Sequence, residues 1–268
     1  MHNKIVLVLF FSTLFSRLAF CQQVHLQPEN GYLKSYLTDT RDLVVQPVHW
    51  KATEWLVVGG AAVTFTAIYA NDLKIQEFWQ QNQSDQADFI SKYVAEPFGS
   101  GLYTLPALGI LYGSGWVFDN EKSRHVALLG AKAWVLTGAA TVVLKQLAHR
   151  QRPNEGEHPD PYFWKGPYAF TSSMTSFPSG HTSTAFAVAA VIAGSYPEKW
   201  WLGALSYSAA TLVGASRMYD NKHWASDVFV GALLGWWVGH SLVKSHSNFE
   251  WGASVGSTHA TGQIIYRF

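Results

Sequence analysis

The sequence contains very little cysteine and little charge. Among its 268 residues Cys21 is the only cysteine, and 14% of the residues are charged. A single cysteine excludes an internal disulfide, so stability outside the cytoplasm has to come from packing. The formal net charge is +1, and no long run of lysine and arginine occurs. We therefore expect no nucleic-acid partner, because such a partner requires a basic surface.

The chain also lacks internal repeats, low-complexity tracts and a series of strands. Only the stretch 262–268 at its end is strand-like. Apolar segments of helical length dominate, and Gly or Pro marks several of their ends. The sequence therefore predicts an all-α protein. The predicted helices are 51–70, 85–95, 100–118, 122–150, 181–196, 199–217 and 223–245.

The N-terminus has the pattern of a secretory signal peptide. Lys4 precedes an apolar run over residues 5–15, and a polar stretch begins after Cys21. We expect cleavage after Cys21, which leaves the exported protein without cysteine. Lipidation of Cys21 is an alternative, because the preceding residues loosely resemble a lipobox, although Phe20 occupies a position that normally holds a small residue. An uncleaved anchor helix is a further alternative, but the apolar run is short for a membrane span.

Three clusters of phosphate-handling residues lie between residues 145 and 227. They are Lys145 with Arg152-Pro153, then Pro178-Ser179-Gly180-His181, then Ser216-Arg217 with His223 and Asp227. A phosphoryl group in transfer spreads negative charge over its oxygens, so its site needs fixed cations and N–H donors. Lys145, Arg152 and Arg217 supply three cations without a metal ion. The arginine fork pairs with two oxygens at once, whereas lysine acts as a compact point charge.

The second and third clusters also suggest how acid–base work is divided. Ser179 and Gly180 precede a helical run, so their backbone N–H groups are expected at a helix N-terminus, where anions bind. His223 and Asp227 are four residues apart, so on a helix the carboxylate can hold an imidazole N–H and stabilise the imidazolium. His181 is then the acid that protonates the departing alkoxide.

Each of these residues also has a structural explanation when it is considered alone. A single histidine is more often structural than catalytic. Lys145 and Arg152 fit a basic helix end, and Asp227 fits an acidic helix start. The functional interpretation depends on the conjunction, because all three spacings occur in order in one chain.

Written as K-x6-R-P, P-S-G-H and S-R-x5-H-x3-D, the clusters resemble the signature of the type-2 phosphatidic acid phosphatase (PAP2) superfamily. That superfamily includes lipid phosphatases, bacterial class A acid phosphatases, glucose-6-phosphatase and vanadium haloperoxidases. The resemblance covers about a third of the chain. It implies a bundle of about six core helices with the active site at one end, and no metal or other cofactor. It also implies that His223 attacks phosphorus to form a phosphohistidine, while His181 first protonates the leaving group and then activates water.

The sequence therefore divides into four parts. Residues 1–21 are the predicted signal peptide, and residues 22–50 are a polar arm, expected to be exposed and to end in a short helix or turn. Residues 51–245 form the predicted PAP2 phosphatase domain. Residues 246–268 form a C-terminal tail for which the sequence predicts no function.

These observations predict a metal-independent phosphatase acting on phosphate monoesters or pyrophosphates of lipid or isoprenoid substrates at the cell envelope. A soluble periplasmic acid phosphatase of broad specificity is the first alternative; it shares the mechanism and differs in the leaving group. A vanadate-dependent haloperoxidase, with vanadate as cofactor, is a remote alternative because the chain is short for that branch. A non-catalytic envelope scaffold is disfavoured by the intact His181, His223 and Asp227. Neither the physiological substrate nor the oligomeric state follows from the sequence.

The sequence gives conflicting indications about a membrane. The candidate spans are 54–70, 99–118, 125–144, 182–196, 200–216 and 227–243. Six spans fit the membrane relatives, but most charge-free runs are about 16–17 residues, below the roughly 20 that a bilayer requires. Lys132 interrupts the third span. If the signal peptide is cleaved, three spans place Lys145 on the inner side. We nevertheless expect membrane association and an active site that faces the periplasm.

The connection 154–177 is the longest non-periodic segment between the clusters. It joins Arg152 to the turn at His181, so it is expected to border the mouth of the pocket. Our hypothesis is that its aromatic side chains contact the leaving group of the substrate. The alternative is that they cap a small core. The residues concerned are Tyr162, Phe163, Trp164 and Tyr168.

Overall fold

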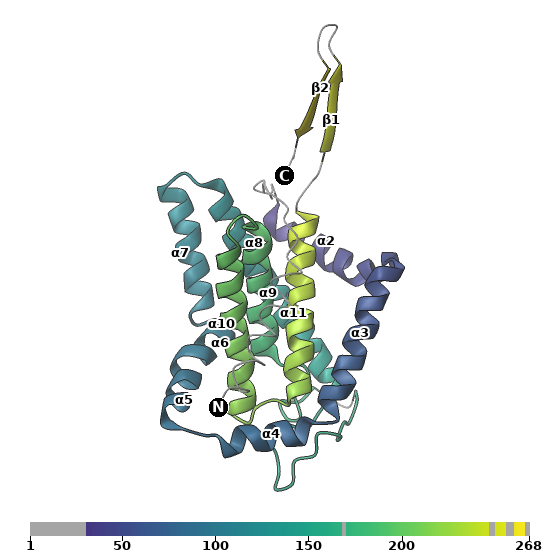
Figure 1. Ribbon diagram of the computed structural model, residues 1–268, viewed down its shortest axis with the longest axis vertical. Helices are drawn as coiled ribbons and strands as arrows, with labels where there is room; N and C mark the ends of the chain where they lie inside the picture. The colour runs from purple at the N-terminus through teal and green to yellow at the C-terminus, as the bar shows by residue number, and fades with distance from the viewer. Residues whose placement is uncertain (1–30, 168–169, 247–249, 256–259, 266–268) are drawn as a thin grey trace.

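The computed structural model shows a bundle of long helices, with a β-hairpin beyond the end of the last helix (Figure 1). It describes residues 31–167, 170–246, 250–255 and 260–265, so the predicted signal peptide and Tyr168 lie outside the described residues. The helices are α2 (Tyr32–Val45), the 3₁₀ helix η1 (Gln46–His49), α3 (Ala52–Tyr69), α4 (Asp72–Gln81), α5 (Asp85–Ile90), the π-helical turn η2 (Ser91–Ala95), α6 (Glu96–Ser100), α7 (Thr104–Val117), α8 (Glu121–Ala148), α9 (Gly180–Ser195), α10 (Trp200–Tyr219) and α11 (Ala225–Ser245). The strands β1 (Glu250–Val255) and β2 (Ala260–Ile265) pair antiparallel.

The all-α prediction is confirmed for the bundle. The predicted helices at 51–70, 122–150, 181–196, 199–217 and 223–245 are α3, α8, α9, α10 and α11, with ends that differ by at most two residues. The predicted helix 85–95 is divided between α5 and η2, and α7 begins four residues later than predicted. Helices α2, α4 and α6 were not predicted. The strand-like tail overlaps β2, whereas β1 was missed.

Helix α9 lies at the centre and packs against α8, α10 and α11. Most of its residues are buried, as expected for a helix that is apolar on every face. Its backbone lies close to α11 at three glycines spaced four residues apart, Gly231, Gly235 and Gly239. At Gly235 an added Cβ would lie 2.0 Å from the carbonyl oxygen of Ser183, so only glycine permits this approach. The glycines therefore hold the middle of α11 against the first part of α9.

The helices of the bundle alternate in direction, which brings all three sequence clusters to one end. The C-terminal ends of α8 and α10 and the N-terminal ends of α9 and α11 lie at the lower end in Figure 1. Helix α4 lies across this end. Lys145 is in the last turn of α8, and Arg217 is in the last turn of α10. His181 and Asp227 are in the first turns of α9 and α11.

Residues 32–49 form α2 and η1, so this segment ends in a short helix as expected, and most of its residues are exposed, but helix α2 itself was not predicted. The carboxylate of Asp39 is buried, and its Oδ2 accepts a hydrogen bond of 2.7 Å from Nζ of Lys132. The hydroxyl of Tyr32 donates to the carbonyl oxygen of Leu128 at 2.8 Å. These contacts attach α2 to the part of α8 that is remote from the predicted site. Lys132, expected to interrupt a membrane span, therefore has a carboxylate partner 93 residues away in the sequence.

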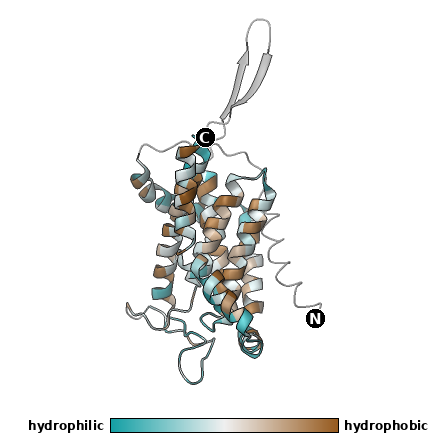
Figure 2. Cartoon of the chain, turned by 90° about the vertical axis from the view of Figure 1, so that its left-hand side faces the viewer, coloured by the Kyte–Doolittle hydropathy of each residue, from teal (hydrophilic) through white to brown (hydrophobic). Residues whose placement is uncertain are grey.

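Of the described helices, α3 and α8 are long and apolar enough to cross a membrane, by length and composition. None of the apolar window of α3 is buried in the protein, against 44% of that of α8. Hydrophobic residues extend along the helices of the bundle (Figure 2). Exposed large side chains on four of these helices include Trp55, Leu56, Val57, Val63, Ile110, Trp116, Val135, Val142, Trp200 and Leu205. Such a surface requires an apolar environment or a partner.

Candidate active site

The first and second sequence clusters meet at the segment before α9. Nζ of Lys145 donates to the carbonyl oxygen of Thr175. Nη2 of Arg152 donates to the same oxygen at 3.3 Å and to Oγ1 of Thr175 at 3.0 Å. A Cβ added at Gly180 would lie 3.8 Å from Cε of Lys145. The two cations and the glycine turn therefore border the same space.

The start of α9 is arranged differently from the prediction in one respect. The backbone N–H of Ser179 donates to the carbonyl oxygen of Asp227 at 3.0 Å, and the Ser179 hydroxyl pairs with Oγ1 of Thr182 at 2.8 Å. Ser179 therefore joins α9 to α11, and its N–H group is not available to a phosphate in this structure. Gly180 and His181 are the first residues of α9, and N–H groups at a helix start have no partner within the helix. These two N–H groups replace that of Ser179 as candidate anion donors.

The three cations differ in their partners. Arg217 is buried, and its guanidinium lies 2.7 Å from Oδ2 of Asp220 and 3.6 Å from Oε1 of Glu96. Among the described residues, neither Lys145 nor Arg152 has a carboxylate oxygen within 4.0 Å of its side-chain nitrogens. Both instead donate to a neutral carbonyl group. A phosphate oxygen would be a stronger acceptor for them, because charge-assisted hydrogen bonds are stronger.

His223 and Asp227 are adjacent, but the predicted hydrogen bond between them is not formed. His223 precedes α11 instead of lying on it, and its Nδ1 is 3.8 Å from Oδ2 of Asp227. Nδ1 is buried and has no hydrogen-bond partner among the described residues. Oδ2 accepts instead from the N–H of Trp224 at 3.0 Å and from Oγ of Ser176 at 2.5 Å. Asp227 is thus also a helix cap, and a movement of about 1 Å would bring it into hydrogen-bond range of the imidazole.

Both histidines are held neutral. Burial lowers the pKa of His223 to about 3, with Lys145 and Arg152 acting in the same direction and Asp227 opposing them. Burial and the nearby Arg217 lower the pKa of His181 to about 4. A neutral imidazole is the form that attacks phosphorus, which suits His223. His181 needs a proton to act as an acid, and the negative charge of a bound phosphate raises the pKa of a neighbouring imidazole.

Two charged residues behind Asp227 were missed by the sequence analysis. Nη1 of Arg150 donates to Oδ1 of Asp227 at 2.5 Å, and Nη2 donates to Oδ2 of Asp72 at 2.7 Å. The side chains of all three are completely buried. Arg150 had one sequence signal, since it stands two residues before Arg152 in the first cluster. Asp72 had none, because it is 78 residues from Arg150 in the sequence and starts a helix that was not predicted.

The connection 154–177 divides its aromatic residues between two environments. Nε1 of Trp164 donates to the hydroxyl of Tyr69 at 2.9 Å, and the Trp164 ring lies 5.0 Å from that of Phe177. Trp164 therefore caps a small core, as the alternative interpretation expected. Tyr162 and Phe163 are 49% and 45% exposed. Their contact with a leaving group stays a prediction.

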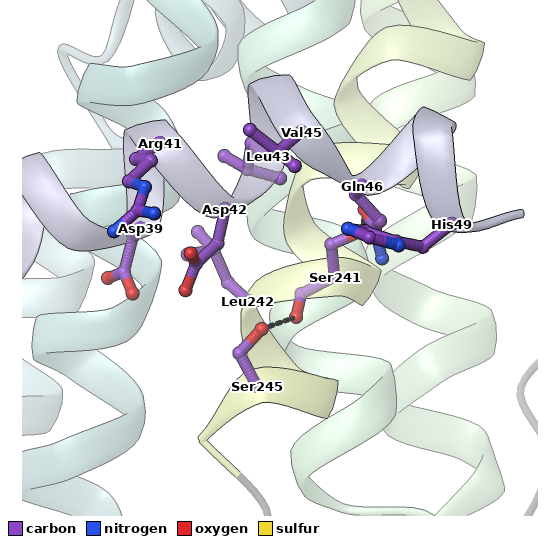
Figure 3. Close-up of a pocket in the computed structure, with 10 residues that line it drawn as sticks. All are labelled: Asp39, Arg41, Asp42, Leu43, Val45, Gln46, His49, Ser241, Leu242 and Ser245. Atoms are coloured by element: carbon purple, nitrogen blue, oxygen red, sulfur yellow. Dashed lines mark hydrogen bonds between the residues drawn. The ribbon is translucent and has the colours of Figure 1, made fainter.

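A pocket of about 410 Å³ lies at the other end of the bundle, between α2, η1 and the end of α11 (Figure 3). It is lined by Asp39, Arg41, Asp42, Leu43, Val45, Gln46, His49, Ser241, Leu242 and Ser245. None of the predicted site residues contributes to it, so it is separate from the candidate active site. Within the described residues, no group of three or more His, Cys, Asp or Glu side chains could hold a metal ion. The metal-free mechanism stays a prediction.

Comparison with known proteins bears on the family. A sequence profile of the PAP2 superfamily matches residues 126–251, which contain all three clusters. This match assigns residues 126–251 to the PAP2 superfamily. A lipid A 1-phosphatase of Porphyromonas gingivalis is 44% identical over 88 residues, which are 30% of this chain and 20% of that protein. An undecaprenyl-diphosphatase of Sulfolobus acidocaldarius is 36% identical over 72 residues, which are 27% of this chain and 34% of that protein.

The PAP2 fold is also found among solved structures. The crystal structure of the first transmembrane PAP2 type phosphatidylglycerolphosphate phosphatase from Bacillus subtilis has a TM-score of 0.52 and 24% identity, covering 69% of this chain and 93% of that chain. This likeness confirms the PAP2-type helical bundle. The matches to the two curated relatives span only a fifth to about a third of their length.

Proposed function

We propose that this PAP2 protein is a metal-independent phosphatase that hydrolyses phosphate monoesters or pyrophosphates of lipids through a phosphohistidine intermediate. The observation that carries the proposal is the position of two cations, Lys145 and Arg152. Neither cation has a carboxylate partner among the described residues, and both border the site of the neutral, buried His223. Cations fixed in a water-poor site stabilise the charge of a phosphoryl group in transfer.

The proposed reaction has two steps. Nε2 of His223 attacks phosphorus, forming a P–N bond while the P–O bond to the leaving group breaks, and His181 gives its proton to the departing oxygen. Water then attacks the phosphohistidine, His181 takes the proton of the water, and the P–N bond breaks to release phosphate. Asp227 faces Nδ1 of His223, so Nε2 is the nitrogen that remains for the attack.

Two observations support a lipid as the leaving group. The curated relatives are named for lipid A and undecaprenyl diphosphate, which are amphiphilic phosphates. The bundle also carries exposed apolar side chains along α3, whose apolar window has no buried residue. An apolar helix surface beside the site suits a substrate that stays in the membrane while its phosphate enters the protein.

We further propose that the enzyme acts at the cell envelope with its site towards the periplasm. If all six long helices cross the membrane, α2 and the end of α11 lie on the opposite side from the site. A periplasmic site then requires that α2 is cytoplasmic, whereas a cleaved signal peptide would deliver α2 to the periplasm. A variant that lacks Cys21 and carries a single cysteine in place of Lys51 decides between these two orientations. The cysteine is labelled with a membrane-impermeant thiol reagent in intact and in permeabilised cells. Labelling in intact cells would contradict a periplasmic site in a six-span protein.

The activity is tested with purified protein on two substrates, a lipid phosphate in detergent micelles and p-nitrophenyl phosphate. We expect phosphate release from the lipid to be faster and to disappear in His223→Ala. His240→Ala is the matched control, because His240 is an exposed histidine on the same helix that follows His223. Faster turnover of p-nitrophenyl phosphate would favour the soluble acid phosphatase. Activity that survives in His223→Ala would contradict the proposed function.

A further inference from the structure

The carboxylate of Asp227 is held by three donors other than His223. Arg150 donates to Oδ1, while Ser176 and the N–H of Trp224 donate to Oδ2. Nδ1 of His223 lies 3.8 Å from Oδ2 and has no hydrogen-bond partner among the described residues. Because Oδ2 already accepts two hydrogen bonds, its exact position decides whether the imidazole can reach it as a third donor. The orientation of Asp227 therefore depends on these donors, and Arg150 is the charged one.

Arg150 is itself fixed from every side. Its Nε donates to the carbonyl oxygen of Pro161 at 3.0 Å, and its Nη2 donates to Asp72 at 2.7 Å. Three aromatic rings surround the guanidinium, with centroids 4.9–5.8 Å away. They belong to Tyr69, Trp164 and Trp224. A fork held in this way can place a carboxylate within a few tenths of an ångström, which a flexible lysine cannot do.

Asp72 closes the network on the side of α4. Its Oδ1 accepts from the N–H of Ser226 at 3.0 Å, and its Oδ2 accepts from Oγ of Ser226 at 2.5 Å. The same Ser226 hydroxyl accepts from Nη1 of Arg150 at 2.7 Å. Asp72 thus contacts both Arg150 and the residue that precedes Asp227. It does so from a helix outside the three sequence clusters.

We propose that Asp72 and Arg150 are positioning residues that act through Asp227 to hold His223 in the orientation for attack on phosphorus. A purely structural role explains the network less well, because buried ion pairs commonly stabilise a fold no more than apolar residues of similar size. The network also has a defined position, since it joins α4, the segment that carries Arg152, and the start of α11. This inference rests on the proposed phosphatase activity.

The test is a double-mutant cycle on kcat. Asp72→Asn is nearly isosteric, and its amide oxygen can still accept from Ser226, so the variant is expected to fold. We expect Asp72→Asn and Arg150→Gln to lower kcat roughly 10- to 100-fold, the range found when outer partners of metal-bound histidines are removed. The KM and the inhibition constant of inorganic phosphate should change less than about twofold, because Lys145, Arg152 and Arg217 bind the phosphate.

Adding Asp72→Asn to the variant Asp227→Asn distinguishes a positioning role from a purely structural one. If Asp72 acts through Asp227, adding Asp72→Asn to Asp227→Asn lowers kcat by less than about twofold. The matched control is Asp39→Asn, which removes another buried aspartate from an ion pair, far from the site. It should lower the melting temperature and leave kcat unchanged.

Two results would overturn the inference while the phosphatase assignment survives. One is a kcat within twofold of wild type in Asp72→Asn. The other is an equal loss from Asp72→Asn in the wild-type and Asp227→Asn backgrounds. In both cases His223→Ala would still be inactive. An active His223→Ala would instead contradict the phosphatase assignment itself.

Discussion

The protein buries an ion-pair cluster at each end of its bundle, and the two clusters differ in what they hold. At the site end, the guanidinium of Arg150 lies between the carboxylates of Asp72 and Asp227, all completely buried. At the other end, Nζ of Lys132 lies 2.7 Å from Oδ2 of Asp39, with the side chains 1% and 8% exposed. Both clusters link elements that are distant in the sequence. Only the ion-pair cluster at the site end contains a residue of the three sequence clusters, Asp227.

Under the proposed mechanism, position, more than chemistry, separates the role of one cluster from that of the other. Lys132 pairs with Asp39 beside two tyrosine rings at 5.2 and 5.7 Å, and it attaches α2 to α8. Arg150 has a similar aromatic surrounding, but its fork reaches two carboxylates at once, one of which faces His223, the proposed nucleophile. A single ammonium group cannot bridge two carboxylates with that geometry.

Asp227→Asn breaks the site-end cluster at the residue nearest the chemistry, and it should have the largest effect. An amide cannot stabilise the imidazolium form of His223, so we expect kcat to fall on the order of 10²–10⁴-fold. Binding of vanadate, a phosphate mimic, should be retained because the cations remain. Steady-state kinetics with vanadate inhibition measures both. A kcat near that of wild type would mean that Asp227 serves only as the cap of α11.

Arg217→Lys tests whether the arginine fork matters as much in the phosphate clamp as in the Arg150 cluster. Arg217 reaches both Asp220 and Glu96, and lysine would lose one of these contacts together with a donor to phosphate. We expect kcat/KM to fall on the order of 10²-fold although the charge is kept. Lys222→Arg is a control for a change in charge geometry at an exposed position nearby. Equal kcat/KM for Arg217→Lys and wild type would exclude a bidentate role.

Asp39→Asn breaks the cluster at the far end. It removes the carboxylate partner of the buried Lys132, and loss of one partner of a buried pair costs about 3 kcal/mol. The melting temperature, followed by circular dichroism in detergent, should therefore fall by several degrees. Phosphate release at 25 °C should be unchanged. A large loss of activity without a loss of stability would mean that the two ends of the bundle are coupled.

The two histidines at the site end should make the stability of the protein depend on pH. This is the smallest of the expected effects. The pKa values of His181 and His223 are lowered from 6.5 to about 4 and about 3, respectively. Between pH 6.5 and these lowered values, the unfolded chain therefore binds more protons than the folded one. Their contribution to stability is complete above about pH 6.5 and is lost as the pH falls, by at most about 1.4 kcal/mol per unit and per histidine. His181→Gln should reduce the fall in melting temperature between pH 7 and pH 5. An unchanged fall would contradict a neutral buried His181.

Local pattern was sufficient to predict the long helices of the bundle. The run from Thr182 to Tyr196 is largely apolar, which indicated a helix, and α9 is buried on nearly all sides. Lys145, His181 and Arg217 were selected from their chemistry, their spacing and the family resemblance, and the alternating helix directions bring them to one end. These features depend on neighbouring residues in the chain.

Contacts between distant segments were not accessible to the same reasoning. Lys132 was interpreted as a charge that opposes a membrane span, because nothing in its surroundings points to Asp39. Asp72 is a single aspartate at the start of a short helix, and its partner Arg150 is supplied by another segment. The hydrogen bond from the N–H group of Ser179 to the carbonyl oxygen of Asp227 was not predicted either, because Asp227 is far along the chain.

The most direct test of the mechanism is to trap the phosphoenzyme. p-Nitrophenolate leaves without needing a proton, so His181→Asn should still be phosphorylated by p-nitrophenyl phosphate but should hydrolyse the intermediate slowly. We predict a burst of p-nitrophenolate close to one equivalent per protein, with an acid-labile, base-stable phosphate on His223 located by peptide mass spectrometry. The double variant with His223→Ala should show neither the burst nor the label. A burst without phosphate on His223, or a label that persists in the double variant, would contradict the proposed mechanism.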